Sequence, residues 1–267
     1  MKNFSCILVV GSSGQIGTAL MLESRSRGMQ TVGIDLRDNP WEASLTDLKM
    51  DFLDYIPHEK DHPTDLIFLA TEPSAQRLEK NPSINSKNYR DFDHAAELTK
   101  NYQMRLIIIS SRELFGLSPH EVSLYQAQKL YEQQKKDFET RLFEMGKQGY
   151  KTGILRVPIA FAGYDTDLER LPRLVPRWCA NIIKGEEILI EKDKEIELIL
   201  VEKVAKMLVN LLIRERGSFL KEIRGAKISL KALADLIRSV AKDNQNKKNE
   251  ADDMLRLGIK KTLAALF

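Results

Sequence analysis

The sequence predicts an α/β fold in which a doubly wound parallel sheet is followed by a small mixed lobe. Over about the first 160 residues, short apolar runs alternate with longer helical stretches, and such alternation is typical of parallel strands joined by helical crossovers. After about residue 157 the elements become shorter and of mixed type. We therefore expect one domain over residues 1–160 and a smaller lobe over 161–267, with some strands or helices interleaved between them.

The strands of the predicted sheet are short and uniformly apolar. Residues 6–10 read Cys-Ile-Leu-Val-Val, as expected of a strand that is buried on both faces. Similar runs predict four more strands, at 31–34, 66–69, 105–109 and 152–155. Helices are expected between them at 15–27, 85–103 and 122–148. These connections are long enough for right-handed crossovers.

The second lobe is predicted to combine helices with short strands. A helix is expected to end near residue 184, before two strand candidates at 187–191 and 196–200. Helices are predicted at 202–214 and 229–241, then an exposed loop at 242–250 and a last short helix. The apolar residues of these segments predict a second, smaller core.

The composition is that of an ordinary soluble protein, with 43% hydrophobic and 30% charged residues. Lys and Arg (41) nearly balance Asp and Glu (38), which gives no case for binding nucleic acid or a membrane surface. Cys6 and Cys179 lie far apart, so neither a disulfide framework nor a cysteine metal site is expected. No run approaches the roughly 20 apolar residues of a membrane span. We expect a cytoplasmic protein.

A glycine-rich turn joins the first predicted strand to the first predicted helix. It reads Gly11-Ser-Ser-Gly14-Gln-Ile-Gly17. The first glycine permits the tight turn, the second lets a pyrophosphate approach the backbone, and the third lets the helix pack on the strand. Free N–H groups at the start of the helix then face the phosphates. This context predicts a Rossmann-type dinucleotide site, and a turn that serves packing alone is the alternative.

Further cofactor contacts are predicted along the same sheet edge. Asp35 ends the second strand, where a carboxylate accepts hydrogen bonds from both ribose hydroxyls and repels the extra phosphate of NADP. NAD is therefore the expected cofactor, although the positive charge of nearby Arg37 would favour the extra phosphate of NADP. Asp51 is a candidate adenine contact or simply a polar residue that ends a strand. The remaining predicted contacts are Gln15, Ile16 and Ala70.

A candidate catalytic set follows the strand at 105–109. Tyr125 and Lys129 stand at i and i+4 on one predicted helix, so they share a face. A nearby ammonium lowers the pKa of a phenol and prepares it for proton transfer. Ser111 ends the central strand, where ligands bind in such sheets. Without the serine, the Tyr–Lys pair would indicate only a solvated helix face. Without the Tyr–Lys pair, Ser110 and Ser111 would indicate only the capping of a helix or turn.

These residues together resemble an extended short-chain dehydrogenase/reductase of the NAD-dependent epimerase/dehydratase family. The resemblance covers nearly the whole chain and is most specific over the first 160 residues. It is carried by the glycine turn, Asp51-Phe52, Asn81-Pro-Ser followed by Asn88, Ser110-Ser111-Arg-Glu-Leu-Phe-Gly116, Tyr125, Lys129, Leu155-Arg156, the run from Lys184 and the helix from Ser229.

The resemblance implies a role for several of these residues. Asp51 and Phe52 would contact adenine, and Tyr125 and Lys129 would form the catalytic pair and contact the cofactor. Glu113 would act beside Tyr125 as an acid/base, as in similar nucleotide-sugar dehydratases and decarboxylases, or would simply face water at a loop start. The helices at 85–103 and 122–148 would pair two copies of the chain, although the second is rich in Gln, Lys and Glu, which disfavours a tight apolar homodimer interface.

Three departures from the family concern the substrate. The segment between Ser111 and Tyr125 is short, and Ile159 stands where an asparagine often faces the sugar nucleotide. Ile196 falls where the family commonly has a diphosphate-binding arginine, and an isoleucine cannot neutralise a diphosphate. The missing positive charge could come from Arg170, Arg173 and Arg177 instead. A solvated basic face is the preferred interpretation of these three arginines.

The resulting expectation is an NAD-dependent epimerase or dehydratase that acts on a nucleotide-activated sugar through a transient ketone. Two alternatives stay open. The first is a dehydrogenase or ketoreductase of a smaller carbonyl compound, which the isoleucines at 159 and 196 favour. The second is an NAD-binding regulatory protein that lacks catalysis, since a fold alone does not establish activity.

Overall fold

The computed structural model describes residues 6–57, 63–72, 78, 81–112, 126–164, 174–246 and 254–264. For residues 126–129, 243–246 and 254 it describes the backbone only. Contacts divide the chain into two compact units. The first contains Met1–Val157 together with Ala205–Glu222, and the second contains Pro158–Val204 together with Ile223–Phe267. Each unit has its own core and is described separately.

The first unit is built on a seven-stranded sheet in the order β3-β2-β1-β4-β5-β6-β9. All of its strand pairs are parallel. The order reverses between β1 and β4, which makes the carboxyl ends of these strands the topological switch point where ligands bind. The predicted doubly wound sheet is therefore confirmed. Its strands are β1 (Cys6–Val10), β2 (Thr31–Asp35), β3 (Leu48–Lys49), β4 (Pro63–Phe68), β5 (Arg105–Ser111), β6 (Thr152–Val157) and β9 (Phe219–Glu222).

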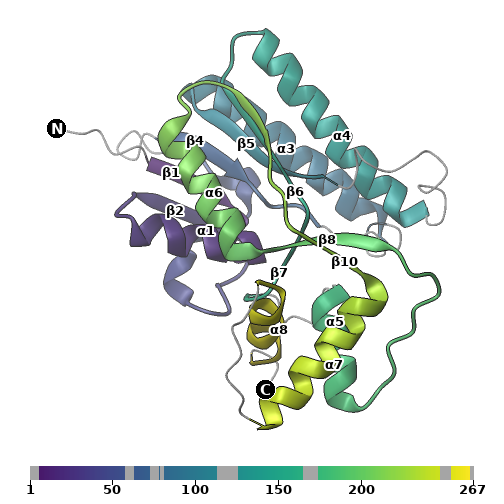
Figure 1. Ribbon diagram of the computed structural model, residues 1–267. Coiled ribbons are helices and arrows are strands. Elements are labelled where there is room, and N and C mark those ends of the chain that lie inside the picture. Colours follow the sequence, from purple (N-terminus) through teal and green to yellow (C-terminus); the bar gives the residue numbers. More distant parts are fainter. Residues whose placement is uncertain are drawn as a thin grey trace. The chain divides into compact units, whose positions relative to one another are not determined.

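Helices cover both faces of this sheet (Figure 1). One face carries α3 (Pro82–Tyr102) and α4 (Gln126–Lys147), and the other carries α1 (Gln15–Ser26) and the later part of α6 (Val201–Arg214). Phe92 and Phe138 stack between the sheet and the first pair of helices, with 4.1 Å between their ring centroids. Two short 3-10 turns, Ala43–Leu45 and Phe52–Asp54, lie between β2 and β4.

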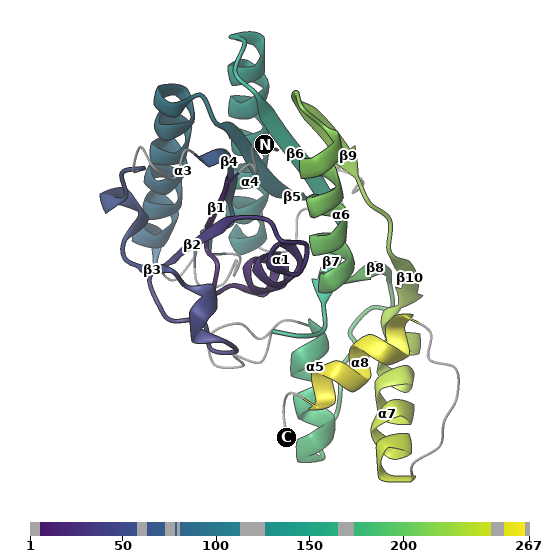
Figure 2. The same cartoon turned by 90° about the vertical axis from the view of Figure 1, so that its left-hand side faces the viewer.

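The second unit combines a three-stranded sheet with three helices. Its strands are β7 (Ile159–Phe161), β8 (Glu195–Leu200) and β10 (Ala226–Ser229), in the order β10-β8-β7. The β8–β10 pair is antiparallel and the β7–β8 pair is parallel, as expected of a mixed lobe. Its helices, which gather side by side in Figure 2, are α5 (Leu174–Lys184), α7 (Leu230–Asn246) and α8 (Met254–Ala264).

Two predicted elements of this unit are wrong. Residues 187–191 form no strand: Ile188 is buried and Ile190 packs against the core, while Leu189 is 84% exposed. The alternating apolar side chains thus reach the core without a partner strand. The loop predicted from residue 242 begins later, because α7 continues to Asn246. Among the described helices, none is long and apolar enough to span a bilayer.

Candidate functional site

The glycine turn lies at the switch point of the sheet. Gly11 follows β1 with a φ of +92°, a conformation that side chains disfavour. A Cβ at Gly11 would lie 2.8 Å from the main-chain nitrogen of Ala70, which follows β4. The structure therefore brings Gly11 and Ala70, two of the predicted cofactor contacts, against each other.

The remaining glycines of the turn have different roles. A Cβ at Gly17 would lie 2.1 Å from the carbonyl oxygen of Gly11, so α1 can pack against the turn only without a side chain there. Gly14 has a φ of −74° and is the N-cap of α1, but it offers no side-chain hydrogen bond to the helix. Gly14 and Ile16 are partly exposed, whereas Gln15 is buried. A helix start without a side-chain cap or an acidic first turn fits the pyrophosphate of a dinucleotide.

Asp35 lies at the end of β2 beside this turn. Its Oδ2 accepts a hydrogen bond from the Ser13 main-chain nitrogen at 2.9 Å, and its Oδ1 accepts one from the Arg37 nitrogen at 3.3 Å. The carboxylate is only partly buried, and each of its oxygens can accept a second hydrogen bond. Asp35 thus shapes the turn and keeps acceptor capacity for a ribose.

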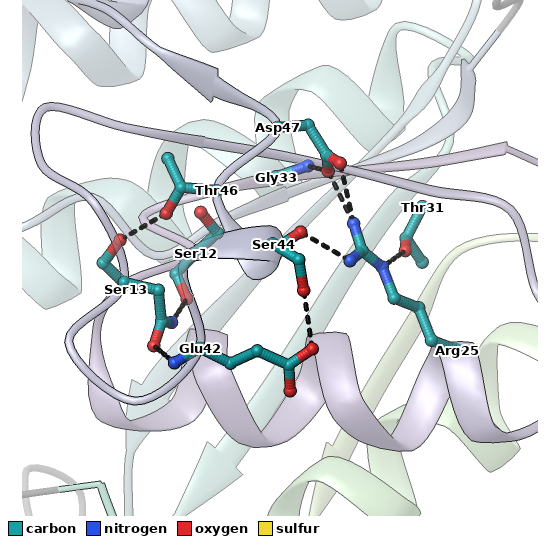
Figure 3. Close-up of polar contacts among 10 residues, drawn as sticks. Ser12, Ser13, Arg25, Thr31, Gly33, Glu42, Ser44, Thr46 and Asp47 are labelled. Carbon is teal, nitrogen blue, oxygen red and sulfur yellow. Dashed lines mark hydrogen bonds and ion pairs between the residues drawn. The ribbon is translucent and has the colours of Figure 1, made fainter.

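The loop after β2 is fastened to the glycine turn by side chains that the sequence analysis did not single out. The buried Asn39 donates through Nδ2 to the Ser12 carbonyl at 3.2 Å and to Thr18 Oγ1 at 2.8 Å. The Ser13 and Thr46 hydroxyls share a hydrogen bond at 2.8 Å (Figure 3). Since unpaired buried polar groups are costly, these contacts fix the loop against the turn.

A second set of contacts holds the far end of the same loop. Arg25 of α1 donates to Thr31 Oγ1 at 3.1 Å and to the Ser44 carbonyl at 2.6 Å, and it pairs with Asp47 at 2.7 Å (Figure 3). Asp47 in turn accepts a hydrogen bond from the Gly33 nitrogen at 2.7 Å. The wall beside Asp35 is therefore anchored on both β2 and α1.

Asp51, the predicted adenine contact, is engaged in an ion pair. Its Oδ1 lies 2.9 Å from Lys87 Nζ, and the same ammonium lies 3.0 Å from Asp91. Burial works to raise the pKa of Asp51, but the hydrogen bond and charge of Lys87 and the Leu53 N–H lower it below its ordinary value. Phe52 is buried in the core under α3, so its side chain lines no open surface.

Asn88 organises the segment that follows β4. Its Oδ1 accepts a hydrogen bond from the Glu72 nitrogen at 3.2 Å, and its Nδ2 donates to Gln134 Oε1 at 3.4 Å. Gln134 also donates to Asn85 Oδ1 at 2.8 Å. Asn88 is one of the residues that carry the family resemblance, and the structure shows it linking the segment after β4 to α3 and α4.

The predicted catalytic set is only partly within the described residues. Ser111 is the last residue of β5, is partly exposed and pairs with Val157 of β6. Ser110 is 2% exposed, and its hydroxyl has no hydrogen-bond partner among the described residues, so it is not a capping group there. Glu113 and Tyr125 lie outside the described residues. The backbone of Lys129 belongs to α4, but its side chain also lies outside them.

A row of charged side chains lies between β5, β6 and α4. Lys135 is buried, and burial lowers its pKa from 10.5 to about 8 against the opposing charge of Glu139. Glu139 pairs with Arg156 at 2.6 Å, and Arg156 pairs with Glu222 at 3.0 Å. The hydrogen bonds that Arg156 donates to Glu139, above all, raise the pKa of Arg156 above its ordinary value. Arg112 Nε lies 3.7 Å from Glu222, at the carboxyl edge of the sheet.

The residues expected to contact a substrate diphosphate belong to the second unit. Ile196 is 7% exposed and lies in its core, and Ile159 packs against the same core. Arg177 is exposed on α5, whereas Arg170 and Arg173 lie outside the described residues. A buried isoleucine offers no charge, so position 196 cannot neutralise a diphosphate. In the part of the chain that the structure describes, no group of three or more His, Cys, Asp or Glu residues could hold a metal ion.

The parallel sheet, the glycine turn at its switch point and the carboxylate that follows β2 define a dinucleotide-binding α/β protein. The chain belongs to the NAD dependent epimerase/dehydratase family, whose model matches residues 7–219. It is therefore an NAD-dependent enzyme of this family, which confirms the resemblance noted in the sequence. No curated protein sequence matches the chain significantly.

Solved structures with the same fold come from distant relatives. An NAD dependent NDP-hexosamine 5,6-dehydratase involved in tunicamycin biosynthesis is 18% identical, with a TM-score of 0.76 and 97% of each chain covered. UDP-N-acetylglucosamine 4-epimerase from Methanobrevibacter ruminantium M1 is 19% identical, with a TM-score of 0.75 over 99% of this chain and 100% of that one. UDP-glucose 4-epimerase from Thermotoga maritima is 17% identical, with a TM-score of 0.75 over 98% and 100%.

Proposed function

We propose that the protein oxidises a secondary alcohol of a nucleotide-activated sugar to a transient ketone, and then completes an epimerisation, elimination or re-reduction. One observation carries the proposal: Gly11, Ala70 and Ser111 follow or end three consecutive strands, β1, β4 and β5, at one edge of the sheet. Strands lie about 4.8 Å apart, so a dinucleotide on the turn extends toward Ser111. The similar epimerases and the dehydratase act on sugars of this class.

The cofactor end of the site rests on the described contacts. The uncapped start of α1 would bind the pyrophosphate and Asp35 the ribose, because these groups present N–H donors and carboxylate acceptors to them. NAD, when bound, accepts a hydride from the substrate carbon. A carboxylate at position 35 disfavours the additional phosphate of NADP.

The proton chemistry is assigned to residues of the chain. Tyr125 would remove the hydroxyl proton, Lys129 would lower the pKa of that phenol and bind the ribose, and Ser111 would hydrogen-bond the reacting oxygen. Glu113 would move a second proton next to the ketone. In the test, Tyr125→Phe should abolish turnover of a nucleotide sugar while the Kd for NAD stays within about twofold. Turnover retained by this variant would overturn the assignment.

A second function is favoured by the core of the second unit. Ile196 is buried there and Ile159 packs beside it. The chain therefore lacks a polar side chain at two positions where the family often uses an arginine and an asparagine to bind a sugar nucleotide. A ketoreductase of a smaller carbonyl compound fits this observation. Thermal-shift measurements with NAD, NADP and a panel of nucleotide sugars separate the two functions, since a ligand stabilises according to its affinity. Stabilisation by NAD alone, with NADH consumed on small ketones, selects the second one.

Pairing of two copies through α3 and α4 stays a prediction. Among the described residues of α4, Leu130 and Phe143 are exposed apolar side chains at 39% and 45%, next to many charged ones. Sedimentation at working concentration measures the oligomeric state and tests this prediction. The presence of monomer only would contradict pairing.

A further inference from the structure

The carboxyl end of β5 has a neighbouring strand on one side only. Its pairing with β4 ends at Ile108, whereas its pairing with β6 continues to Ser111. In this register the next nitrogen that would face β5 is that of Ala70, which lies beyond the end of β4 at Phe68, because Leu69 faces β1 and donates to the Val10 carbonyl. From the Ile109 carbonyl to Ser111, the predicted catalytic serine, the end of β5 therefore lacks the β4 partner that fixes the rest of the strand.

A lysine from α4 supplies the missing donor. Alternate residues of a parallel strand direct their N–H and C=O groups to the same neighbour. The Leu106 nitrogen bonds toward β6, at the Lys151 carbonyl, so Ile109 directs its carbonyl to the side of β4. Lys135 Nζ donates to this carbonyl oxygen at 3.1 Å. Since a buried carbonyl without a donor is costly, this contact replaces the absent strand.

The opposite side of the same segment is held through β6. The Arg112 nitrogen donates to the Val157 carbonyl at 2.9 Å. The Arg112 side chain lies near Glu222, which also pairs with Arg156. Ser111 is thus situated between an anchor at the Ile109 carbonyl and another at the Arg112 nitrogen.

We propose that Lys135 is a positioning residue that holds the end of β5, and with it the hydroxyl of Ser111, in the place where that hydroxyl meets the substrate oxygen. The inference rests on the proposed role of Ser111. A neutral amine and an ammonium both donate hydrogen bonds, so the contact does not depend on the charge of Lys135. Lys135 acts through the backbone of β5 and is not assigned a contact with substrate or cofactor.

The first test compares two variants of the same helix. Lys135→Met keeps the length of the side chain and removes the donor, and Lys136→Met is the matched control because Lys136 is exposed. Loss of one hydrogen bond predicts about tenfold faster amide exchange at Arg112 in Lys135→Met, with exchange at Leu106 to Ile108 unchanged. Lys136→Met should exchange like the parent. Equal exchange at Arg112 in all three proteins would overturn the anchor, and this measurement needs no substrate.

The second test asks whether the anchor acts through Ser111. Lys135→Met should lower kcat on a nucleotide sugar about tenfold, with KM and the Kd for NAD within about twofold of the parent. In a Ser111→Ala background the same change should cost less than about twofold, because the hydroxyl that it positions is absent. An equal loss in both backgrounds would refute the positioning role. Lys135→Arg keeps a donor and should retain slow exchange, which provides the comparison if Lys135→Met does not fold.

The two tests separate this inference from the proposed function. A parent protein that turns over no nucleotide sugar, yet shows the exchange difference at Arg112, contradicts the proposed function and supports the anchor. A parent that turns over nucleotide sugars, with unchanged exchange and kcat in Lys135→Met, supports the function and refutes the inference.

Discussion

Asp65 and Arg105 face each other on β4 and β5 and form a buried ion pair, with 2.6 Å between Arg105 Nε and Asp65 Oδ1. Arg105 also donates to the carbonyl oxygens of Glu215 and Gly217, and its guanidinium lies over the ring of Phe219. The pair thus links the centre of the sheet to the segment that returns to the first unit. Both side chains are nearly inaccessible, at 5% and 7% exposure.

Removing one partner of this pair should be costly. Asp65→Ala leaves the Arg105 charge buried without its carboxylate, and the free energy of unfolding should fall by about 3–5 kcal/mol. Asp93→Ala is the control, because Asp93 pairs with Arg141 at the surface and such pairs contribute less than about 1 kcal/mol. Urea unfolding of both variants provides the measurement. Similar losses in the two variants would contradict the distinction.

Two glycines of the turn should respond differently to alanine. At Gly17 the new Cβ meets the Gly11 carbonyl oxygen at 2.1 Å, whereas at Gly14 it lies 3.4 Å from the same atom. Gly17→Ala should therefore lower the melting temperature and abolish NAD binding together. Gly14→Ala should leave the melting temperature nearly unchanged and weaken NAD binding, because its methyl group stands at the start of α1. If NAD binds equally well to Gly14→Ala, the pyrophosphate does not approach that helix start.

The loop beside Asp35 should depend on Asn39. Asn39→Ala leaves the Ser12 carbonyl and the Thr18 hydroxyl without their shared donor, and the lost hydrogen bonds should lower the unfolding free energy by about 1–3 kcal/mol. We expect the Kd for NAD to rise about tenfold, since the wall of the ribose site loosens. Isothermal titration calorimetry gives the Kd. Ser44→Ala serves as the control, because Ser44 is exposed and its hydroxyl donates to the exposed side chain of Glu42.

The buried amine of Lys135 should give the stability a defined pH dependence. Its pKa is lowered from 10.5 to about 8 in the folded protein, so between these values the unfolded chain binds more protons. The free energy of unfolding of the parent, minus that of Lys135→Met, should therefore rise as the pH increases from about 8 to 10.5, by up to about 3 kcal/mol. Below pH 8 the full cost of the buried charge is present. Urea unfolding at pH 7, 8.5 and 10 measures this difference. The corresponding difference between the parent and Lys136→Met should not change with pH.

The elements that the sequence predicts well are those whose own residues determine their burial. β1 is buried throughout and β5 is buried as far as Ser110, so their apolar runs are unambiguous. The sequence does not predict β9 and β10, because these strands are short and mostly exposed or half-buried. They belong to a sheet only through pairing with their neighbouring strands. Residues 187–191 were predicted as a strand because side-chain alternation does not reveal whether a partner strand is present.

The residues of the candidate site also divide into those that the local sequence predicts and those that it does not. The spacing of Gly11, Gly14 and Gly17 is local in the sequence, and the structure shows the close approaches that require it at the first and third positions. Asn39 has no local signal in the sequence, and that of Lys135 is weak, since the partners of both residues lie on segments distant in the sequence. A lysine at an otherwise apolar helix position between buried neighbours is the one hint that could have revealed Lys135.

The return of the chain to the first unit also sets an order of events during synthesis. β6 is complete at Val157, but its partner β9 begins only at Phe219. At an elongation rate of about 5–20 residues per second, the nascent chain waits about 3–13 s with one edge of β6 uncovered. An uncovered edge strand readily pairs with other chains. Ribosome-bound intermediates that end before residue 222 are therefore expected to need a chaperone, while the released protein does not.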